Sequence, residues 1–166
     1  DLILEMIGCP NLQIYDDIIR RFDHEVGGGS LTKPLCGKGK GRNPANSYCP
    51  VLGEKEVVLE SYGSNPWQGD IDAYHMGRNN VVDAIGKIIA AGGNLEKIAF
   101  NGNTTCPKPS ADPHIAAQVI RMLKGSADAE IAYGSPRISG KDSPSMQRDY
   151  ISVRTGQKVS VKAKPE

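Results

Sequence analysis

The sequence predicts a domain of the α/β or α+β class, in which short strands alternate with amphipathic helices. Two segments carry hydrophobic residues at helical spacing, and short segments rich in valine and isoleucine flank them. The 166 residues, of which 39% are hydrophobic, suit one packed domain. The 19 glycines and 11 prolines indicate that many turns separate these elements.

The amino-terminal residues have a helical pattern of their own. Residues 2–7 form an apolar run, and residues 14–22 carry isoleucine and phenylalanine at helical spacing until the glycines at 27–29 end the pattern. The chain begins within this pattern rather than at a methionine. We therefore expect residues 1–29 to be a helical linker from a preceding domain, and residues 30–166 to be an α/β domain of a longer chain.

The middle of the chain contains the clearest helix. Residues 30–50 are interrupted by glycine and proline and predict a loop, which a short strand over residues 57–59 follows. After a second loop over residues 62–72, apolar side chains recur at helical spacing through residues 81–89. The glycines at 92–93 end this helix, because glycine accepts the left-handed conformation of a helix C-terminus.

The second helix carries its own start signal. A strand over residues 97–100 and a polar turn over residues 101–109 precede it. Asp112 suits the N-cap, and Pro113 suits the first helical position. We expect Gly125 to interrupt this helix before it resumes.

The last segments predict β structure. Residues 136–139 predict a strand, and residues 140–145 predict the loop that follows it. Residues 151–153 and 159–161 alternate with period two around the turn at residues 155–156, so they predict a terminal hairpin.

Composition excludes some classes of protein. The net charge is +1, from 20 basic and 19 acidic side chains, which argues against a nucleic-acid or membrane-surface binder. No apolar run approaches the roughly 20 residues of a transmembrane helix. The four cysteines lie far apart without a C-x-x-C pair, which favours reduced thiols over zinc ligands or disulfides. We expect a cytoplasmic protein.

Common catalytic signatures are absent from the sequence, including the P-loop, the dinucleotide fingerprint, the nucleophile elbow and the zinc-peptidase motif. Residues 37–41 alternate glycine and lysine as a phosphate-binding loop would, but they lack the flanking strand and helix, so an exposed loop is favoured. His24 lies between two acids, yet adjacent residues on a helix do not face one another, and a polar helix end is favoured.

Carboxylates suggest a magnesium site, since hard cations prefer oxygen ligands. The candidates are Asp70, Asp72, Asp83 and Asp142. Asp72 and Asp83 share a helix face but would lie ~16 Å apart along one continuous helix. They could hold one ion only if Asp72 folds back from the preceding loop, or two ions bridged by phosphates. The alternative for Asp83 is a salt bridge to Lys87, four residues later.

The segment ISGKDS contains the most distinctive charges. Gly140 permits a tight turn after the predicted strand, and Lys141 and Asp142 follow it. Ligands of α/β sheets bind at the carboxyl ends of strands. These two residues are therefore candidate ligand contacts.

Three stretches together resemble a known family. They are NPWQGDIDAYHM, VVDAIGKIIAAGGNLEKIAF and AYGSPRISGKDSPSM. They resemble the synthase part of phosphoribosylformylglycinamidine synthase, in the superfamily of aminoimidazole ribonucleotide synthase. The resemblance implies a mixed four-stranded sheet backed by helices, and it implies that two such domains pair their sheets into a barrel.

The resemblance also implies site residues. It places Asp72, Asp83 and Asp142 at magnesium-binding positions, and it places Lys141, Asp142, Asn103 and Lys87 at positions that contact ATP or ADP. It names no catalytic residue in this chain. Three positions depart from the family pattern, which usually has glutamate at Asp83, asparagine at Lys87 and a carboxylate at Gly102.

The implied function is part of an ATP-dependent ligase of purine biosynthesis. That enzyme converts formylglycinamide ribonucleotide to formylglycinamidine ribonucleotide with ammonia taken from glutamine. The implied partners are nucleotide, a homologous synthase-type domain in a homodimer or in the same chain, and a glutaminase domain or subunit. The alternative is a non-catalytic pairing domain with a residual nucleotide site, which the lysine at position 87 and the glycine at position 102 favour. We expect the isolated chain to be inactive.

Overall fold

The computed structural model describes residues 2–8, 29–32, 36–39 and 43–166. The chain divides into two compact units, Asp1–Val58 and Leu59–Glu166, whereas the sequence suggests a boundary near residue 29. His24 and the helical pattern of residues 14–22 lie outside the described residues. None of the described helices is both long and apolar enough to cross a membrane.

The first unit contains a short helix and a strand pair. Helix α1 spans Leu2–Gly8, and strands β1 (Ser30–Thr32) and β2 (Ala45–Tyr48) pair in antiparallel fashion. The hydroxyl of Ser47 donates to Thr32 Oγ1 at 2.6 Å, and the Thr32 backbone N–H donates to Ser47 Oγ at 2.9 Å. The prediction of a loop for residues 30–50 is therefore wrong over these two strands, which polar hydrogen bonds rather than apolar alternation join.

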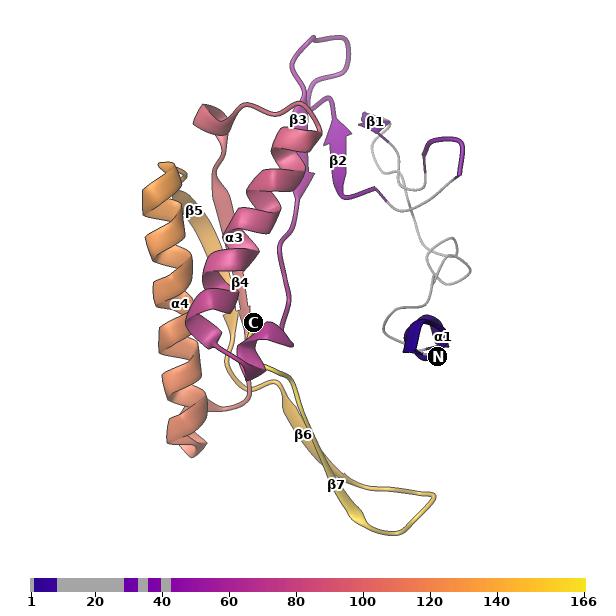
Figure 1. Ribbon diagram of the computed structural model, residues 1–166, viewed down its shortest axis with the longest axis vertical. Helices are drawn as coiled ribbons and strands as arrows, with labels where there is room; N and C mark the ends of the chain where they lie inside the picture. The colour runs from indigo at the N-terminus through magenta and orange to yellow at the C-terminus, as the bar shows by residue number, and fades with distance from the viewer. Residues whose placement is uncertain (1, 9–28, 33–35, 40–42) are drawn as a thin grey trace. The chain divides into compact units, whose positions relative to one another are not determined.

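The second unit is built around a strand–helix–strand unit (Figure 1). Its larger elements are β3 (Val58–Ser61, which starts at the boundary), α3 (Ala73–Ala90), β4 (Phe100–Thr105), α4 (Pro113–Tyr133) and β5 (Arg137–Ser143). Short 3-10 turns, η2 (Gln68–Asp70), η3 (Leu95–Lys97) and η4 (Pro109–Ala111), precede α3, β4 and α4. Strands β4 and β5 are parallel, and α4 connects them.

Helices α3 and α4 lie side by side (Figure 1), and glycines lie where the two helices touch. A Cβ atom on Gly125 would lie 2.0 Å from the carbonyl oxygen of Tyr74, and one on Gly77 would lie 2.1 Å from that of Met122. The prediction that Gly125 interrupts its helix is wrong, since α4 is continuous. The glycine instead lets the two backbones approach closely.

The helices cover one face of the parallel strand pair. Val81 and Ile85 of α3 and Ala129 of α4 form a buried cluster, and Ile98 and Phe100 pack against it. A second cluster, which includes Met76 and Met122, lies between the helices. The core thus fixes the position of β4 on the helices.

Strands β4 and β5 are longer and more polar than predicted. The register pairs Gly102 with Gly140, Asn103 with Lys141 and Thr104 with Asp142. The predictions of a turn over residues 101–109 and a loop over residues 140–145 are wrong over most of these strands, and the strand expected at residues 97–100 begins only at Phe100. Backbone hydrogen bonds between distant segments form these strands, and a polar sequence does not reveal such bonds.

The terminal hairpin is confirmed, with its first strand earlier than predicted. Strand β6 (Gln147–Ile151) pairs with β7 (Lys158–Lys162) around a turn in which Gly156 has φ of 67°. Beyond it, Glu166 and Thr105 exchange two backbone hydrogen bonds of 2.9 Å. The mixed α+β class is confirmed, but β4–β5 and β6–β7 form separate pairs rather than parts of one four-stranded sheet.

Candidate functional site

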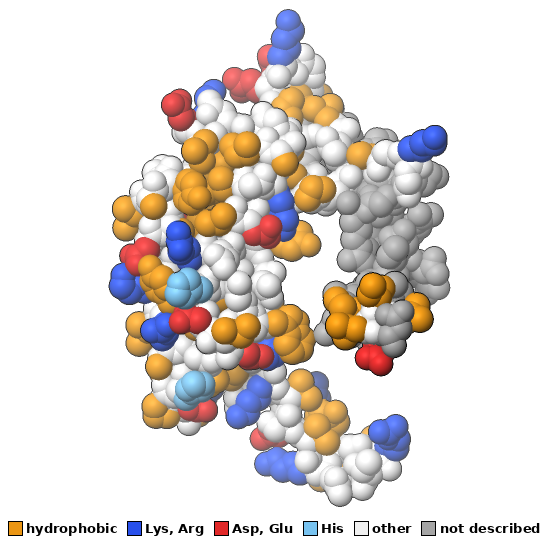
Figure 2. All heavy atoms as spheres, in the orientation of Figure 1, with side chains coloured by type: hydrophobic (Ala, Val, Ile, Leu, Met, Phe, Trp, Pro, Cys, Tyr) orange, Lys and Arg blue, Asp and Glu red, His pale blue; other side chains and the backbone are white. Residues whose placement is uncertain are grey.

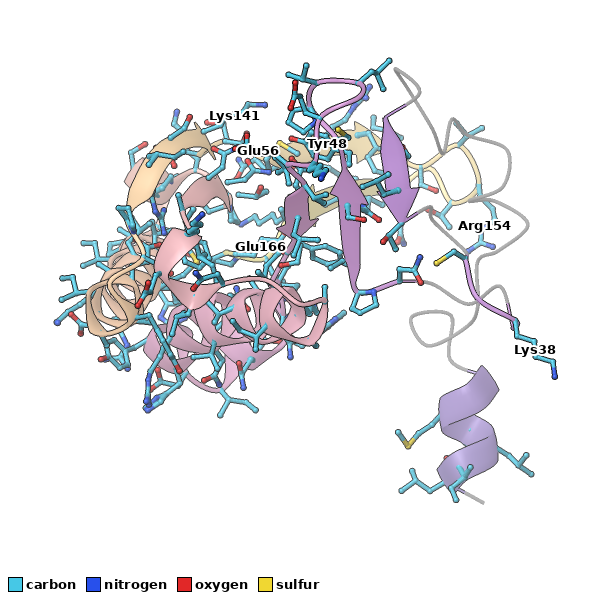
Figure 3. The ribbon with its side chains drawn as sticks, turned by 90° about the horizontal axis from the view of Figure 1, so that it is seen from above. Lys38, Tyr48, Glu56, Lys141, Arg154 and Glu166 are labelled. Atoms are coloured by element: carbon cyan, nitrogen blue, oxygen red, sulfur yellow. The ribbon has the colours of Figure 1, made fainter. Side chains whose placement is uncertain are left out.

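The face of β4 and β5 turned away from the helices carries polar side chains. Asn101 and Asn103 are exposed, whereas Thr104, which lies on the other face, is 7% exposed. Lys141 is the register partner of Asn103, and neighbouring residues in register point to the same face. Figure 3 shows Lys141 on the side of β5 away from α3 and α4. This face is therefore a candidate site with an amide and an ammonium side by side.

Strand alternation separates two residues that the sequence places together. Asp142 follows Lys141 directly and shares its face with Thr104, the helix-facing side of the pair. The thiol of Cys106 is 1% exposed, and its burial, together with the nearby charge of Asp142, raises the pKa of that thiol. Lys141 thus has Asn103 as its partner in the candidate site, and Asp142 lies on the opposite face.

Asp72 has two structural roles at the start of α3. Its side chain caps the helix by accepting a 3.0 Å hydrogen bond from the backbone N–H of His75. Its other oxygen accepts a 2.7 Å hydrogen bond from Arg121 of α4. The hydrogen bond from His75, with the charge of Arg121, lowers the pKa of Asp72. Asp72 therefore links the two helices at this end.

Asp83 and Lys87 form the ion pair that was the alternative to a metal role. The Lys87 ammonium lies 2.6 Å from Asp83 Oδ2 and donates to the carbonyl oxygen of Tyr62 at 2.7 Å. It also lies 4.6 Å from the centre of the Tyr62 ring. The resemblance implies that Asp83 binds magnesium and that Lys87 contacts nucleotide. In the structure these two side chains lie together and bind each other.

The arrangement does not fit a magnesium ion held by Asp72, Asp83 and Asp142. Within the described part of the chain, no group of three or more histidine, cysteine, aspartate or glutamate side chains is placed to hold a metal. Arg121 and Lys87 already neutralise Asp72 and Asp83. The fourth candidate, Asp70, is paired with Lys164.

An ion pair that sequence reasoning missed occupies the space beside Gly102. Arg137 Nη2 lies 2.5 Å from Oε1 of Glu130, and Glu130 is buried with 8% of its surface exposed. A Cβ atom on Gly102 would lie 2.4 Å from Arg137 Nη1. The position where the family usually carries a carboxylate therefore faces a guanidinium. The seven-residue separation of Glu130 and Arg137 crosses the end of α4, so helical spacing does not predict the pair.

The glycine–lysine segment shows no phosphate-binding geometry in its described part. Gly37 to Gly39 form an exposed turn, with φ of 85° at Gly37, and no helix begins there. The remainder of this segment lies outside the described residues.

Comparisons with known proteins give a consistent result. No family model matches the chain. The phosphoribosylformylglycinamidine synthase subunit PurL of Thermococcus sibiricus is 26% identical over 140 residues, which are 84% of this chain and 18% of that protein. The PurL subunit of Rhodopseudomonas palustris (strain BisB18) is 29% identical over 136 residues, which are 82% of this chain and 17% of that protein.

A solved structure shares the fold. The structure of PurLQS from Thermotoga maritima superimposes with a TM-score of 0.64 at 16% identity, and the match covers 90% of this chain and 22% of that one. The α+β fold and the resemblance inferred from the sequence are confirmed. The chain spans less than a fifth of the length of these two curated relatives.

Proposed function

Because the chain is similar to PurL subunits of phosphoribosylformylglycinamidine synthase over more than four fifths of its length, we propose that it is an α/β domain of such an enzyme. The whole enzyme would convert formylglycinamide ribonucleotide to formylglycinamidine ribonucleotide with ATP and glutamine-derived ammonia. The observation that carries the proposal is sequence similarity over more than four fifths of the chain, together with a fold match that covers 90% of it.

Within that reaction, the proposed role of this chain is to bind nucleotide. The amide substrate is activated when the γ-phosphoryl group of ATP is transferred to its oxygen; ammonia then adds and phosphate leaves. The proteins that carry out phosphoryl transfer contribute mainly positioning and charge. Lys141 supplies a positive charge for phosphate, and the Asn103 amide beside it supplies a donor and an acceptor. The groups that attack and activate the substrate would come from the rest of the enzyme.

Isothermal titration with ATP and with ADP tests this role. Lys141→Ala should weaken binding by about tenfold or more, since a hydrogen bond to a charged group contributes about 1.5–3 kcal/mol. Lys97→Ala is the matched control, because Lys97 is exposed and precedes β4 at the opposite end of the parallel strands. Equal affinities for the two variants would refute the assignment of Lys141.

A second candidate function is a pairing domain without catalytic chemistry. It is favoured by the internal ion pairs of Asp72 and Asp83 and by the exposed hydrophobic side chains of the hairpin. In the hairpin, Tyr150, Ile151 and Val161 are 45%, 69% and 53% exposed. Figure 2 shows hydrophobic side chains on the surface of this hairpin. The proposed partner is a homologous synthase-type domain, with a glutaminase domain or subunit in the same assembly.

Sedimentation equilibrium separates the two functions when it is combined with the titration. A pairing domain should self-associate as the concentration rises, because a two-stranded hairpin with exposed edges is marginally stable alone. Association without nucleotide binding at millimolar ATP would favour the pairing domain. A 17.8 kDa monomer at all concentrations would count against pairing through the hairpin.

A further inference from the structure

The ammonium of Lys87 is held by three electron-rich groups from two segments. It contacts the Asp83 carboxylate at 2.6 Å, the Tyr62 carbonyl oxygen at 2.7 Å and the Tyr62 ring at 4.6 Å from its centre. Its side chain is 23% exposed, whereas that of Asp83 is 51% exposed. We call Lys87, Asp83 and Tyr62 together the Lys87 clamp.

The segment that the clamp holds lies directly on α3. The Ser61 hydroxyl donates to the carbonyl oxygen of Ala84 at 2.8 Å. A Cβ atom on Gly63 would lie 1.8 Å from the carbonyl oxygen of Asn80, so residue 63 must be glycine for this approach. The clamp closes the contact one turn further along the helix, because Lys87 follows Ala84 by three residues.

The contacts of Lys87 are those that a hard cation would make. Carboxylate and carbonyl oxygens are the ligands that divalent cations such as Mg²⁺ take from proteins. An ammonium has three N–H donors, and here two of them serve these oxygens while the ring face receives the remaining positive charge. The charge of Asp83 is therefore balanced within the chain.

We propose that Lys87 acts as a built-in cation, which holds residues 61–63 on α3 and excludes a divalent metal ion from Asp83. The other two carboxylates that the resemblance assigns to magnesium do not offset this exclusion. Asp72 is bound by Arg121 and by the helix N-terminus, and Asp142 lies on β5. The surface at Asp83 is consequently metal-independent, whether or not the chain binds nucleotide elsewhere.

Backbone ¹⁵N relaxation on the whole chain tests the holding role. Lys87→Gln removes the charge and should lower the order parameters of Gly63 and Ser64 from about 0.85 toward about 0.6, the range of flexible backbone. Lys124→Gln is the matched control, since Lys124 also pairs with an aspartate four residues later and lies 5.9 Å from a tyrosine ring. Lys87→Arg, which keeps the charge, should preserve the order.

Unchanged order parameters in Lys87→Gln would overturn the holding role. If that variant loses its folded spectrum, Asp83→Asn serves in its place. This variant leaves the Tyr62 carbonyl contact intact and should give a smaller loss of order at Gly63.

Manganese added to the same samples tests the exclusion of metal, because Mn²⁺ broadens the signals of nearby amides. With one equivalent of Mn²⁺, the amides around Asp83 in the unmodified chain should remain as sharp as those of the β6–β7 hairpin. Selective broadening around Asp83 that Asp83→Asn removes would overturn the proposal. This readout does not depend on nucleotide, so its failure is distinct from failure of the proposed function.

Discussion

At the scale of single residues, acidic side chains join the elements of the second unit. Asp72 binds Arg121 across α3 and α4, and Glu130 binds Arg137 across α4 and β5. Among the described residues, no ion pair to Lys141 is present. Asp72 and Glu130 thus serve in ion pairs that join elements, and the Lys141 ammonium remains available for a ligand.

The pKa shift of Asp72 predicts a pH-dependent contribution to stability. Its pKa in the folded chain lies below the ordinary 3.8, so the stability it adds is complete above that value and is lost as the pH falls through the lower, folded pKa. Asp72→Asn keeps a good N-cap but loses the charge that pairs with Arg121. The variant should melt below the unmodified chain at about pH 5, and the two should converge at about pH 2. Thermal melts across that range check it, and a constant difference would contradict the assignment.

Burial predicts that one thiol reacts slowly. Cys106 is 1% exposed and its thiol pKa is raised, mainly by burial, so little reactive thiolate is present. Cys36 is exposed. In the folded chain a thiol reagent should label Cys36 well before Cys106, and denaturant should remove the difference. Peptide mass mapping after brief labelling measures both, and equal labelling would show that Cys106 is accessible.

At the scale of elements, the sequence predicts where helices begin and does not predict which distant strands pair. The start of α4 follows from Asp112 and Pro113, because the cap is a bond between neighbours, here from the His114 N–H at 2.9 Å. Strands β4 and β5 were missed beyond their first residues, since their stability depends on a partner more than thirty residues away. The role of Gly125 likewise depends on α3, which lies against it.

The candidate site shows the same division. The sequence identified Lys141 and Asn103 separately, but only the register shows that they are neighbours. For Asp83 the sequence left two roles open, a metal ligand and an ion pair to Lys87, because the four-residue spacing on a helix suits the ion pair without excluding the metal. The ion pair is favoured because the Tyr62 carbonyl oxygen also accepts from Lys87, and the position of that oxygen is set by tertiary structure.

Close helix packing predicts opposite effects for two glycine-to-alanine changes. Gly125→Ala should destabilise the chain by about 2 kcal/mol or more, because the new methyl group would meet the backbone of α3. Gly86→Ala on α3 should stabilise it by about 0.5–1 kcal/mol, since nothing lies within 4 Å and alanine favours the helix. Urea unfolding of both variants measures the difference. Equal effects would show that the helices do not approach as closely as described.

At the scale of the whole molecule, the second unit offers one covered and one open sheet face. The helices cover the first face through the cluster around Val81 and Ile85. The open face carries Asn103 and Lys141. We propose that this open face contacts nucleotide.

Hydrogen–deuterium exchange with and without saturating ADP tests that claim most directly. We predict protection in residues 101–105 and 139–142, the paired parts of β4 and β5, and the protection should be lost in Lys141→Ala and kept in Lys97→Ala. Protection confined to other residues, or none at millimolar ADP, would contradict the claim.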